Sequence, residues 1–406
     1  MSDSGLSLDA GALVEDPYPF YERLRSEAPV WRLPGTDVFM VSTWDLIAET
    51  VGRVEAFSNH FRHTLFTQDD GTVGVLAFGE GAPDVFAGAD PPAHTAHRRV
   101  FFPELVRTKM ETLEADVTAL ADALLDPIVA AGGGDAAADL ANLLPIRIMA
   151  ERVMGLHDAD PDQTRRWVFA GSRFMGGRLR LDEMGPVGEE AAGMASWITA
   201  QLDDALASSG SGDVLHAAAT GVRDGVLTHD EAAFTLMVLL GAGGETTTSL
   251  IGNAIRILAE RAELQDALRA DPARVPAFVE EALRFESPFR FHPRTARGPA
   301  ELGGVGIPDG ALVMLLWGSA NRDPSVFDRA DHVVLDRPNA QLHLAFGRGI
   351  HHCVGAPLAR LEARVVLTRL LERTARFSLD PDRPPRWTDS LWLRRHDTLP
   401  IEAVPG

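Results

Sequence analysis

The residues best able to do chemistry lie in one stretch, "FGRGIHHCVGAPLAR", which spans residues 346–360 of a 406-residue chain. It holds the only cysteine, Cys353, beside two histidines and among a set of glycines. A sulfur that binds a metal must be a thiolate, and the N–H groups of a helix N-terminus lower the pKa of a thiol. A helical pattern starts directly after Cys353, and Gly347, Gly349 and Gly355 permit a tight loop against a flat ligand. The stretch therefore predicts a thiolate that is presented to a ligand.

Cys353 alone is compatible with several roles. A lone cysteine is often a small buried hydrophobic residue. The nearby histidines would also allow a Cys/His nucleophile. A structural zinc site is poorly supported, because such sites need several sulfur or histidine ligands at set spacings.

A second unusual stretch, "LMVLLGAGGETTTSLIGNAIRILA" (236–259), places several glycines inside an apolar helical pattern. Each glycine costs a helix interior about 1 kcal/mol relative to alanine. One possibility is that a helix ends here and Thr246 caps the next. The alternative is that one helix crosses the face of a cofactor, where small residues leave room for a diatomic ligand and water, and a local widening exposes a carbonyl. Thr228 and Glu231 form a capping-box pattern at the start of this helix.

These stretches need a scaffold, and helical periodicity dominates from about residue 90 to 286. Loops are predicted at 132–135 and 208–213, where glycine and serine gather. After Pro288, short apolar runs alternate with turn residues, as in "ELGGVGIPDGALVMLLW", and predict small strands. The fold class is therefore mainly α with small β-sheets, and residues 1–406 are expected to form a single domain.

Composition narrows the function. Acidic residues outnumber basic ones 58 to 38, a net charge of −20, which argues against general binding to nucleic acid or to anionic membranes. One cysteine excludes an internal disulfide framework and fits a reducing compartment. The N-terminus lacks the basic and apolar regions of a signal peptide, and no run reaches the ~20 apolar residues of a membrane span. A cytoplasmic protein without a membrane anchor is predicted.

The pattern Phe346-Gly347-x-Gly349-x-His351-x-Cys353-x-Gly355, followed by "APLARLE", resembles the haem-binding loop of the cytochrome P450 family. The resemblance extends from "DPYPFYERLRSEAPVW" near the start to the last helix. It implies the cytochrome P450 fold, a triangular prism with haem b (iron protoporphyrin IX) between the oxygen-activation helix and the cysteine-loop helix. It also implies that Cys353 is the metal ligand, an axial thiolate that donates electron density to the iron and favours O–O cleavage.

Ala242-Gly243-x-Glu245-Thr246 is similar to the oxygen-activation motif of that family. By this resemblance Thr246 and Glu245 are the catalytic residues. Thr246 would organise protons during oxygen activation, and Glu245 would help to relay them from solvent.

The two propionates of a buried haem need cations. The stretch "DPPAHTAHRRV" supplies His94 and Arg98 one helical turn apart, in a pattern similar to that of the family's bacterial members. Arg294 and His351 complete the cofactor-binding set that the resemblance implies.

Glu281-Ala282-Leu283-Arg284 would by itself be an ordinary helical ion pair. Because "FESPFRFHPR" follows it, the stretch is similar to the family's Glu-x-x-Arg helix, with Arg337 in "LDRP" as a third partner. The resemblance implies that Glu281, Arg284 and Arg337 form a buried structural ion network that fixes the cysteine loop. His97 and His352 match no such role and are expected to be structural or surface residues.

Three segments are expected to line a substrate pocket over the haem. Their apolar side chains suit a hydrophobic small molecule such as a lipid, steroid, terpenoid or polyketide, although many of them would serve equally well as core. They are Leu65, Phe66, Leu76, Phe78 and Phe86 in a loop-rich stretch 60–88, Phe169, Phe174 and Met175 in a lid region 167–186, and Phe289, Phe291 and His292. An arginine cluster in the lid region would suit an acidic substrate, but a solvated helix face is favoured; the cluster comprises Arg165, Arg166, Arg173, Arg178 and Arg180.

Electrons must come from another protein, because no flavin-binding or iron–sulfur segment is fused to this sequence. Basic residues near the propionate helix and the cysteine helix predict a docking face for an acidic ferredoxin. They are Arg98, Arg99, Arg348, Arg360 and Arg364. The resemblance also makes azole-type inhibitors plausible.

The sequence thus predicts a haem-thiolate monooxygenase that inserts one oxygen atom from O2 into a hydrophobic small molecule, with electrons from a ferredoxin and its reductase. Two rivals stay open: a peroxide-driven haem-thiolate enzyme, against which the Glu245–Thr246 pair speaks, and a haem-binding sensor or carrier without turnover. A cysteine hydrolase is a more distant third and would show no haem spectrum.

Overall fold

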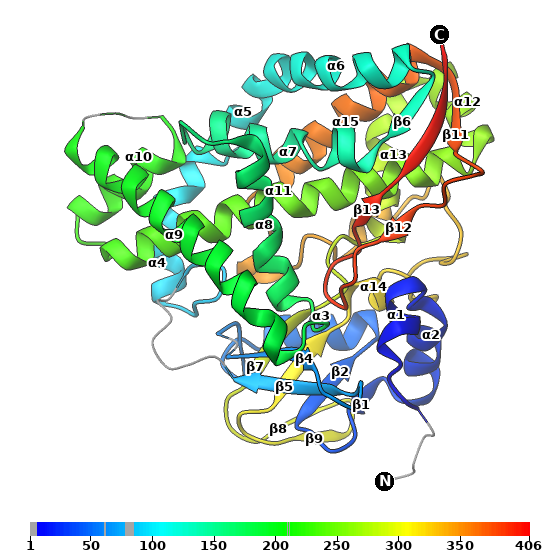
Figure 1. The fold of residues 1–406 in the computed structure, drawn as a ribbon. Helices are drawn as coiled ribbons and strands as arrows, with labels where there is room; N and C mark the ends of the chain where they lie inside the picture. The colour runs from blue at the N-terminus through cyan, green and yellow to red at the C-terminus, as the bar shows by residue number, and fades with distance from the viewer. Residues whose placement is uncertain (1–5, 61, 78–84, 209, 211) are drawn as a thin grey trace.

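The computed structural model describes residues 6–60, 62–77, 85–208, 210 and 212–406. Its α-helices are α1 (Ala10–Glu15), α2 (Tyr18–Glu27), α3 (Trp44–Gly52), α4 (Ala93–Phe101), α5 (Arg107–Met110), α6 (Glu114–Ala130), α7 (Leu144–Arg147), α8 (Pro161–Met175), α9 (Met184–Ala207), α10 (Val214–Arg223), α11 (His229–Ala259), α12 (Ala262–Ala270), α13 (Val275–Phe285), α14 (Trp317–Ala320) and α15 (Ala356–Arg373). Most of the helices form one large part, and α1–α3 lie at the opposite end beside the main sheet (Figure 1).

The strands are short. They are β1 (Val30–Arg32), β2 (Val38–Val41), β3 (Phe57–Ser58), β4 (His63–Thr67), β5 (Val73–Ala77), β6 (Gly133–Asp135), β7 (His292–Ala296), β8 (Ala300–Leu302), β9 (Val305–Ile307), β10 (Leu312–Leu315), β11 (Thr374–Leu379), β12 (Arg386–Trp387), β13 (His396–Thr398) and β14 (Pro400–Pro405). The mainly helical class with small sheets, expected from the sequence, is confirmed.

The largest sheet of the described residues has the strand order β1-β2-β10-β7-β3, in which only β2 and β10 run parallel. Its central strands are buried on both faces. Successive side chains of a strand point to opposite faces, so Met40 and Met314 join one apolar cluster while Phe39 and Val313 join another. Val313 pairs with Arg294, and this register fixes the position of that arginine along β7.

Helix α11 runs through the middle of the helical part (Figure 1). Its first turn has the expected capping box, because Thr228 Oγ1 accepts from Glu231 N and the Glu231 carboxylate accepts from Thr228 N. Within the described residues it is the only helix long and apolar enough to cross a bilayer, and 61% of its apolar window is buried inside the fold. That burial is typical of a core helix.

The glycines of α11 do not end a helix, so the possibility that Thr246 caps a new one is wrong. The helix is continuous from His229 to Ala259, and no widened turn interrupts it. A Cβ on Gly243 would lie 2.8 Å from Met149 Sδ, and one on Gly244 would lie 2.9 Å from Ile146 Cγ1. These two glycines therefore let α7 and the π-helical turn after it (Ile148–Val153) approach α11 closely.

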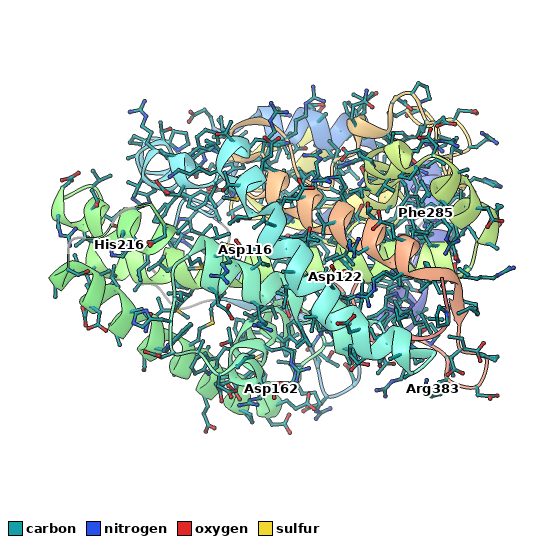
Figure 2. All side chains as sticks on the ribbon, turned by 90° about the horizontal axis from the view of Figure 1, so that it is seen from above. Asp116, Asp122, Asp162, His216, Phe285 and Arg383 are labelled. Carbon is teal, nitrogen blue, oxygen red and sulfur yellow. The ribbon has the colours of Figure 1, made fainter. Side chains whose placement is uncertain are left out.

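The last long helix, α15, begins three residues after Cys353 and lies between α11 and α6 (Figure 2). Its predicted apolar face is buried and consists of Leu358, Leu361, Val365 and Leu370. On the other side, Arg369 Nε donates to Asp122 Oδ1 of α6 at 2.8 Å, and Figure 2 labels that aspartate on α6. Two layers of helix therefore hold the segment that follows the cysteine.

Two predicted loops contain regular structure. Residues 133–135, expected in a loop, form β6, because Gly133 adopts φ 152° and its backbone lies so close to Ile401 O that a Cβ would stand 2.4 Å away. Within 60–88, also expected to be loop-rich, β4 and β5 form an antiparallel hairpin. Strand β6 (Gly-Gly-Asp) has no apolar side chain by which a strand could be recognised, whereas β5 (Val-Gly-Val-Leu-Ala) has an apolar run from which a strand could have been predicted.

Candidate active site

The cysteine loop is a tight turn between Phe346 and Cys353. Cys353 N donates to Phe346 O at 2.9 Å, and Gly347 N donates to Leu344 O at 2.9 Å. Gly347 and Gly349 have φ values of 66° and 73°, a region that side-chain-bearing residues rarely adopt. The two glycines are therefore required by the path of the backbone.

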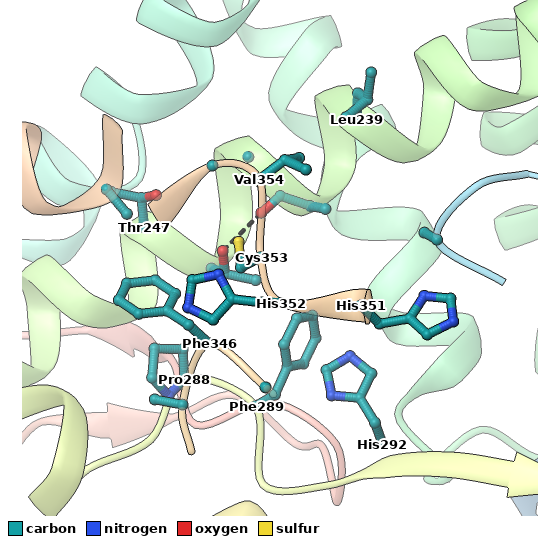
Figure 3. A pocket seen from close by; sticks show the side chains of 18 of the residues that line it. Leu239, Thr247, Pro288, Phe289, His292, Phe346, His351, His352, Cys353 and Val354 are labelled. Atoms are coloured by element: carbon teal, nitrogen blue, oxygen red, sulfur yellow. Dashed lines mark hydrogen bonds between the residues drawn. The ribbon is translucent and has the colours of Figure 1, made fainter. Parts of the chain in front are cut away.

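The Cys353 sulfur faces a cavity (Figure 3). It receives backbone hydrogen bonds from Gly355 and Ala356 at the start of α15. Burial nevertheless dominates and raises the pKa of the thiol, and these N–H groups with Arg360 and Arg98 offset only part of that rise. The Cys353 side chain is itself exposed to this cavity, and a metal ion bound there would hold the sulfur as a thiolate, because coordination to a metal deprotonates a thiol outright.

Neither a Cys/His nucleophile nor a zinc site finds support around Cys353 in the described part of the chain. No hydrogen bond joins its sulfur to a histidine ring, as a Cys/His nucleophile would need. No group of three His, Cys, Asp or Glu side chains there could hold a metal ion, as a protein-only zinc site would require.

One end of the cavity is rich in hydrogen-bond donors without acceptors. Asn59 Nδ2 donates to Ala87 O and lies 3.3 Å from His351 Nδ1. An amide nitrogen only donates, so His351 Nδ1 is the acceptor, and Nε2, which has no partner, carries the proton. His94 is buried and is not among the described residues that line the cavity; neither of its ring nitrogens has a hydrogen-bond partner of good geometry there, and its imidazole centroid lies 4.3 Å from that of His351. Burial is the main cause that lowers the pKa of His351, to about 3, and keeps it neutral.

Two arginines complete this end. Arg294 is 7% exposed, and among the described residues its side chain makes one hydrogen bond, from Nη1 to Pro293 O, which leaves most of its donors free there. Burial lowers its pKa to about 10. Arg98 lines the cavity and donates from Nη2 to His352 O at 2.9 Å, which ties α4 to the residue before the cysteine.

The residues present fit haem. Buried donors without acceptors call for an anion, and His94, Arg98, Arg294 and His351, which lie together, would suit two propionates. The sulfur at the same cavity calls for a metal cation. The remaining lining is mostly apolar, as a porphyrin requires, with Leu250, Leu358 and Phe346 among the lining residues.

Thr246 and Glu245 lie on different faces of α11. Thr246 lines the cavity, and its Oγ1 donates to Ala242 O at 2.6 Å. Glu245 is not among the lining residues; its Oε1 accepts from Ser172 Oγ at 2.6 Å and from Arg395 Nε at 3.1 Å. Burial raises the pKa of Glu245 to about 7, against the lowering influence of Arg395 and Ser172. The carboxyl is therefore held ready to exchange a proton near neutral pH, but away from the cavity.

The three predicted ion-network residues are in direct contact. Arg284 donates to both Glu281 oxygens at 2.7 and 2.8 Å, and Arg337 Nε lies 3.0 Å from Glu281 Oε2. The remaining Arg284 donors reach the carbonyls of Asn321, Ala330 and His332. The network thus binds α13 to the segment that leads into the cysteine loop.

A neighbouring cluster was not expected from the sequence. Glu280 accepts a bidentate pair of hydrogen bonds from Arg360 at 2.6 and 2.9 Å and lies 3.4 Å from His343 Nε2. Arg360 lies over the Phe346 ring at 4.5 Å. Arg360 lies on α15, which begins three residues after Cys353, and its charge acts to lower the pKa of that thiol.

The predicted pocket residues separate into two groups. Phe86, Phe289 and His292 line the cavity, and Phe78 lies outside the described residues. The other predicted pocket residues that the structure describes do not line the cavity. Two of them, Leu65 and Phe291, belong instead to the apolar cluster of the main sheet. Lining residues that the sequence did not indicate include Met149, Val238, Leu239 and Trp317.

The lid-region arginines face surface acids. In the part of the chain that the structure describes, four of the five have a carboxylate partner: Arg165 with Asp162, Arg166 with Glu190, Arg178 with Asp389, and Arg180 with Asp69 and Asp182. Such exposed pairs contribute little to stability and use up the charge that an acidic substrate would need.

The five arginines of the expected docking face also differ. Arg360 and Arg364 pair with Glu280 and Glu114. Arg98 donates to the cysteine loop, and Arg348 lies over the Trp44 ring at 5.1 Å. Arg99 is exposed on α4. In the described residues, therefore, only some of this charge is free of acidic partners.

The family model described as Cytochrome P450 matches residues 202–395. The chain is 36% identical over 390 residues to "Cytochrome P450 144" of Mycobacterium tuberculosis, covering 96% of this chain and 89% of the relative. It is 33% identical over 416 residues to "Cytochrome P450 monooxygenase PikC" of Streptomyces venezuelae, covering 98% and 95%.

Solved structures agree with these sequence relatives. "Cytochrome P450 CREJ in complex with (4-ethylphenyl) dihydrogen phosphate" superposes with a TM-score of 0.87 at 28% identity, covering 96% of this chain and 98% of that one. A mutant of P450 EryK in complex with erythromycin B gives 0.83 at 30% identity, covering 97% and 96%. The similarity thus includes the cysteine loop, α11 and the elements that hold them.

Proposed function

We propose that this chain, which belongs to the cytochrome P450 family, inserts one oxygen atom from O2 into a hydrophobic small molecule with electrons from a ferredoxin-type protein. Relatives named as a monooxygenase and as a hydroxylase match nearly the whole chain, so its reaction class is haem-thiolate monooxygenation. The observation that carries the proposal is the shared cavity, where the Cys353 sulfur and the Thr246 hydroxyl meet a mostly apolar lining.

When bound, haem supplies the oxygen chemistry, which no side chain of the protein can do. Cys353 would hold the iron through its sulfur, while His94, Arg98, Arg294 and His351 would hold the propionates. The hydrogen bond from Arg98 to His352 O would keep the cofactor carboxylates and the cysteine loop in register.

Proton delivery falls to α11. We assign Glu245 as the proton store, because a carboxyl with a pKa near the working pH exchanges protons efficiently. Arg395 pairs with both Glu245 and Asp397, and the Asp397 side chain is 46% exposed, so only one residue separates the buried carboxyl from a group in contact with solvent. Thr246 would then align donors in the cavity with its hydroxyl, once that group leaves Ala242 O.

The substrate class follows from the lining. Phe86, Leu239, Ala242 and Phe289 offer apolar contacts with few polar groups, which suits a hydrophobic molecule. The names and titles of relatives include erythromycin B, β-dihydromenaquinone-9 and (4-ethylphenyl) dihydrogen phosphate, so members of the family act on or bind small molecules of different kinds. Azole-type inhibitors, which join a metal-binding ring nitrogen to an apolar body, would suit the same cavity.

The electron donor would dock beside the cysteine loop. Exposed Arg99 and Arg348 are the docking residues we favour, because Arg360 and Arg364 already have acidic partners. An acidic ferredoxin would be attracted there despite the negative total charge of the protein. We further propose that residues 1–406 act as one domain and work in the cytoplasm.

The experiment combines the purified protein with a ferredoxin, its reductase, a nicotinamide donor and isotopically labelled O2, over a panel of apolar molecules chosen by their spin-state shifts. The proposal expects a product with one labelled oxygen atom and none from Cys353→Ser. A parallel reaction with hydrogen peroxide alone tests the peroxide-driven rival, and product formed only there would overturn the proposal. Turnover that fails to slow with rising salt would argue against the docking face.

A further inference from the structure

We propose that His292 is a further cofactor-binding residue: it donates a hydrogen bond from Nε2 to a carboxylate of the bound haem, and Trp317 holds it in the donating tautomer. The inference rests on membership of a haem-binding family and needs no knowledge of the substrate. It deepens the proposed function by adding a neutral donor to the four residues assigned to the propionates.

The tautomer of His292 is fixed by a single contact. Trp317 Nε1 lies 2.6 Å from His292 Nδ1. An indole N–H can only donate, so His292 Nδ1 must accept and cannot carry a proton. Burial, followed by the charges of Arg294 and His351, lowers the pKa of His292 to about 3, so the imidazole is neutral. Its one proton is therefore on Nε2.

The free N–H group belongs to a residue that lines the cavity. His292 and Arg294 are two positions apart on β7, and alternate residues of a strand share a face. Arg294 and His351 both act electrostatically on the His292 ring, and Figure 3 shows His292 and His351 near each other at one end of the site. His292 thus stands among the groups that already call for an anion.

The ring has little freedom to turn away. Its centroid lies 4.4 Å from that of Phe289 at an interplanar angle of 72°, and 6.1 Å from that of Trp392. The Nε2–H group of His292 lies near Arg294 and His351, which also have donors without acceptors. Burying all of these donors without an acceptor would cost free energy. A carboxylate is the acceptor that satisfies His292, Arg294 and His351 together.

The test measures haem loss in the absence of substrate, as the rate of transfer from the holoprotein to apomyoglobin. His292→Phe removes the donor and should speed transfer about 10-fold or more, the equivalent of one hydrogen bond to a charged group. His292→Gln keeps an N–H donor and should stay within about 3-fold of the parent. Trp317→Phe frees the tautomer and should give an intermediate rate, with a lower reduction potential of the haem iron.

Trp392→Phe is the matched control. It removes an indole N–H from the same aromatic cluster, but that group donates to Phe291 O and not to a histidine. Because a phenyl ring still packs beside His292, the transfer rate of this variant should stay within about 3-fold of the parent. Equal rates for the parent and His292→Phe would overturn the proposal, and a change in substrate binding alone would assign His292 to the substrate. If His292→Phe does not fold, the haem-transfer rate of Trp317→Phe is the deciding measurement. A rate equal to that of the parent would then overturn the proposal that Trp317 holds His292 in the donating tautomer.

Discussion

Arg395 Nε and Glu245 Oε1, 3.1 Å apart, form a buried ion pair between the C-terminal segment and the helix that carries Thr246. Both side chains are about 5% exposed or less. The Arg395 guanidinium also lies over the Phe169 ring of α8 at 3.9 Å, and Ser172 of the same helix donates to the carboxyl. The proton store of the proposed reaction is thus built from three segments.

Stability should fall with rising pH because of Glu245. Burial raises its pKa from 4.5 to about 7, so the folded state binds the proton more tightly than the unfolded state. The stabilisation is complete below pH 4.5 and is lost as the pH rises through 7, by up to about 3 kcal/mol. Urea denaturation of the parent and Glu245→Gln across this range should show the parent losing stability relative to the variant. A parent that gains relative stability with pH would mean that Arg395 controls the carboxyl instead.

Thr246 should determine how much product is formed for each O2 that the enzyme consumes. Thr246→Ala removes the hydroxyl from the cavity wall, and product formed per O2 consumed should fall at least about 10-fold, since positioned proton transfer contributes that much or more. Thr246→Ser keeps the hydroxyl and should retain most of the yield. Oxygen uptake and product are measured together. Unchanged yield in Thr246→Ala would favour a carrier or a peroxide-driven enzyme.

The Glu281 network should be a large contributor to stability. Arg284→Ala leaves a fully buried carboxylate with one partner fewer, and breaking such a pair costs about 3–5 kcal/mol. Guanidinium denaturation followed by circular dichroism measures the loss. Arg23→Ala, in an exposed helical pair with Glu27, is the matched control and should leave the midpoint unchanged. Similar midpoints for both variants would remove the structural role of the network.

Replacing different glycines of α11 by alanine should change the stability of the fold in opposite directions, because their surroundings differ. Gly244→Ala brings a Cβ to 2.9 Å from Ile146 Cγ1 and should destabilise the fold by about 1–3 kcal/mol through overpacking. Gly241 has nothing within 4 Å of such a Cβ, so Gly241→Ala should stabilise the helix by up to about 1 kcal/mol. Thermal unfolding of the two variants compares them. The opposite order would contradict the packing role assigned to Gly244.

Local patterns in the sequence predicted the elements that such patterns specify. The capping box of Thr228 and Glu231 gave the start of α11, and the apolar face after Cys353 gave α15, because both depend on residues a few positions apart. The resemblance to the family's motifs predicted the contact of Glu281 and Arg284 with Arg337, although Arg337 lies 56 positions after Glu281 in the sequence. No local rule could have joined Glu281 to Arg337.

The parts that were missed depend on distant contacts. Glu286 accepts from Tyr18 at 2.7 Å, Arg256 at 2.6 Å and Arg394 at 3.1 Å, residues from far-apart parts of the chain. Strand β6 exists because Gly133 lies against Ile401, and the pocket residues were overestimated because aromatic side chains suit a core as well as a lining. Tertiary packing decides such cases, and short-range patterns do not contain it.

The most direct test of the account is the absorption spectrum of the reduced, carbon monoxide-bound protein, compared with that of Cys353→His. The account predicts the strongly red-shifted Soret band of thiolate-ligated haem in the parent and its loss in the variant. A parent spectrum typical of histidine-ligated haem, or the absence of any haem band after reconstitution, would contradict the assignment of Cys353 as the iron ligand.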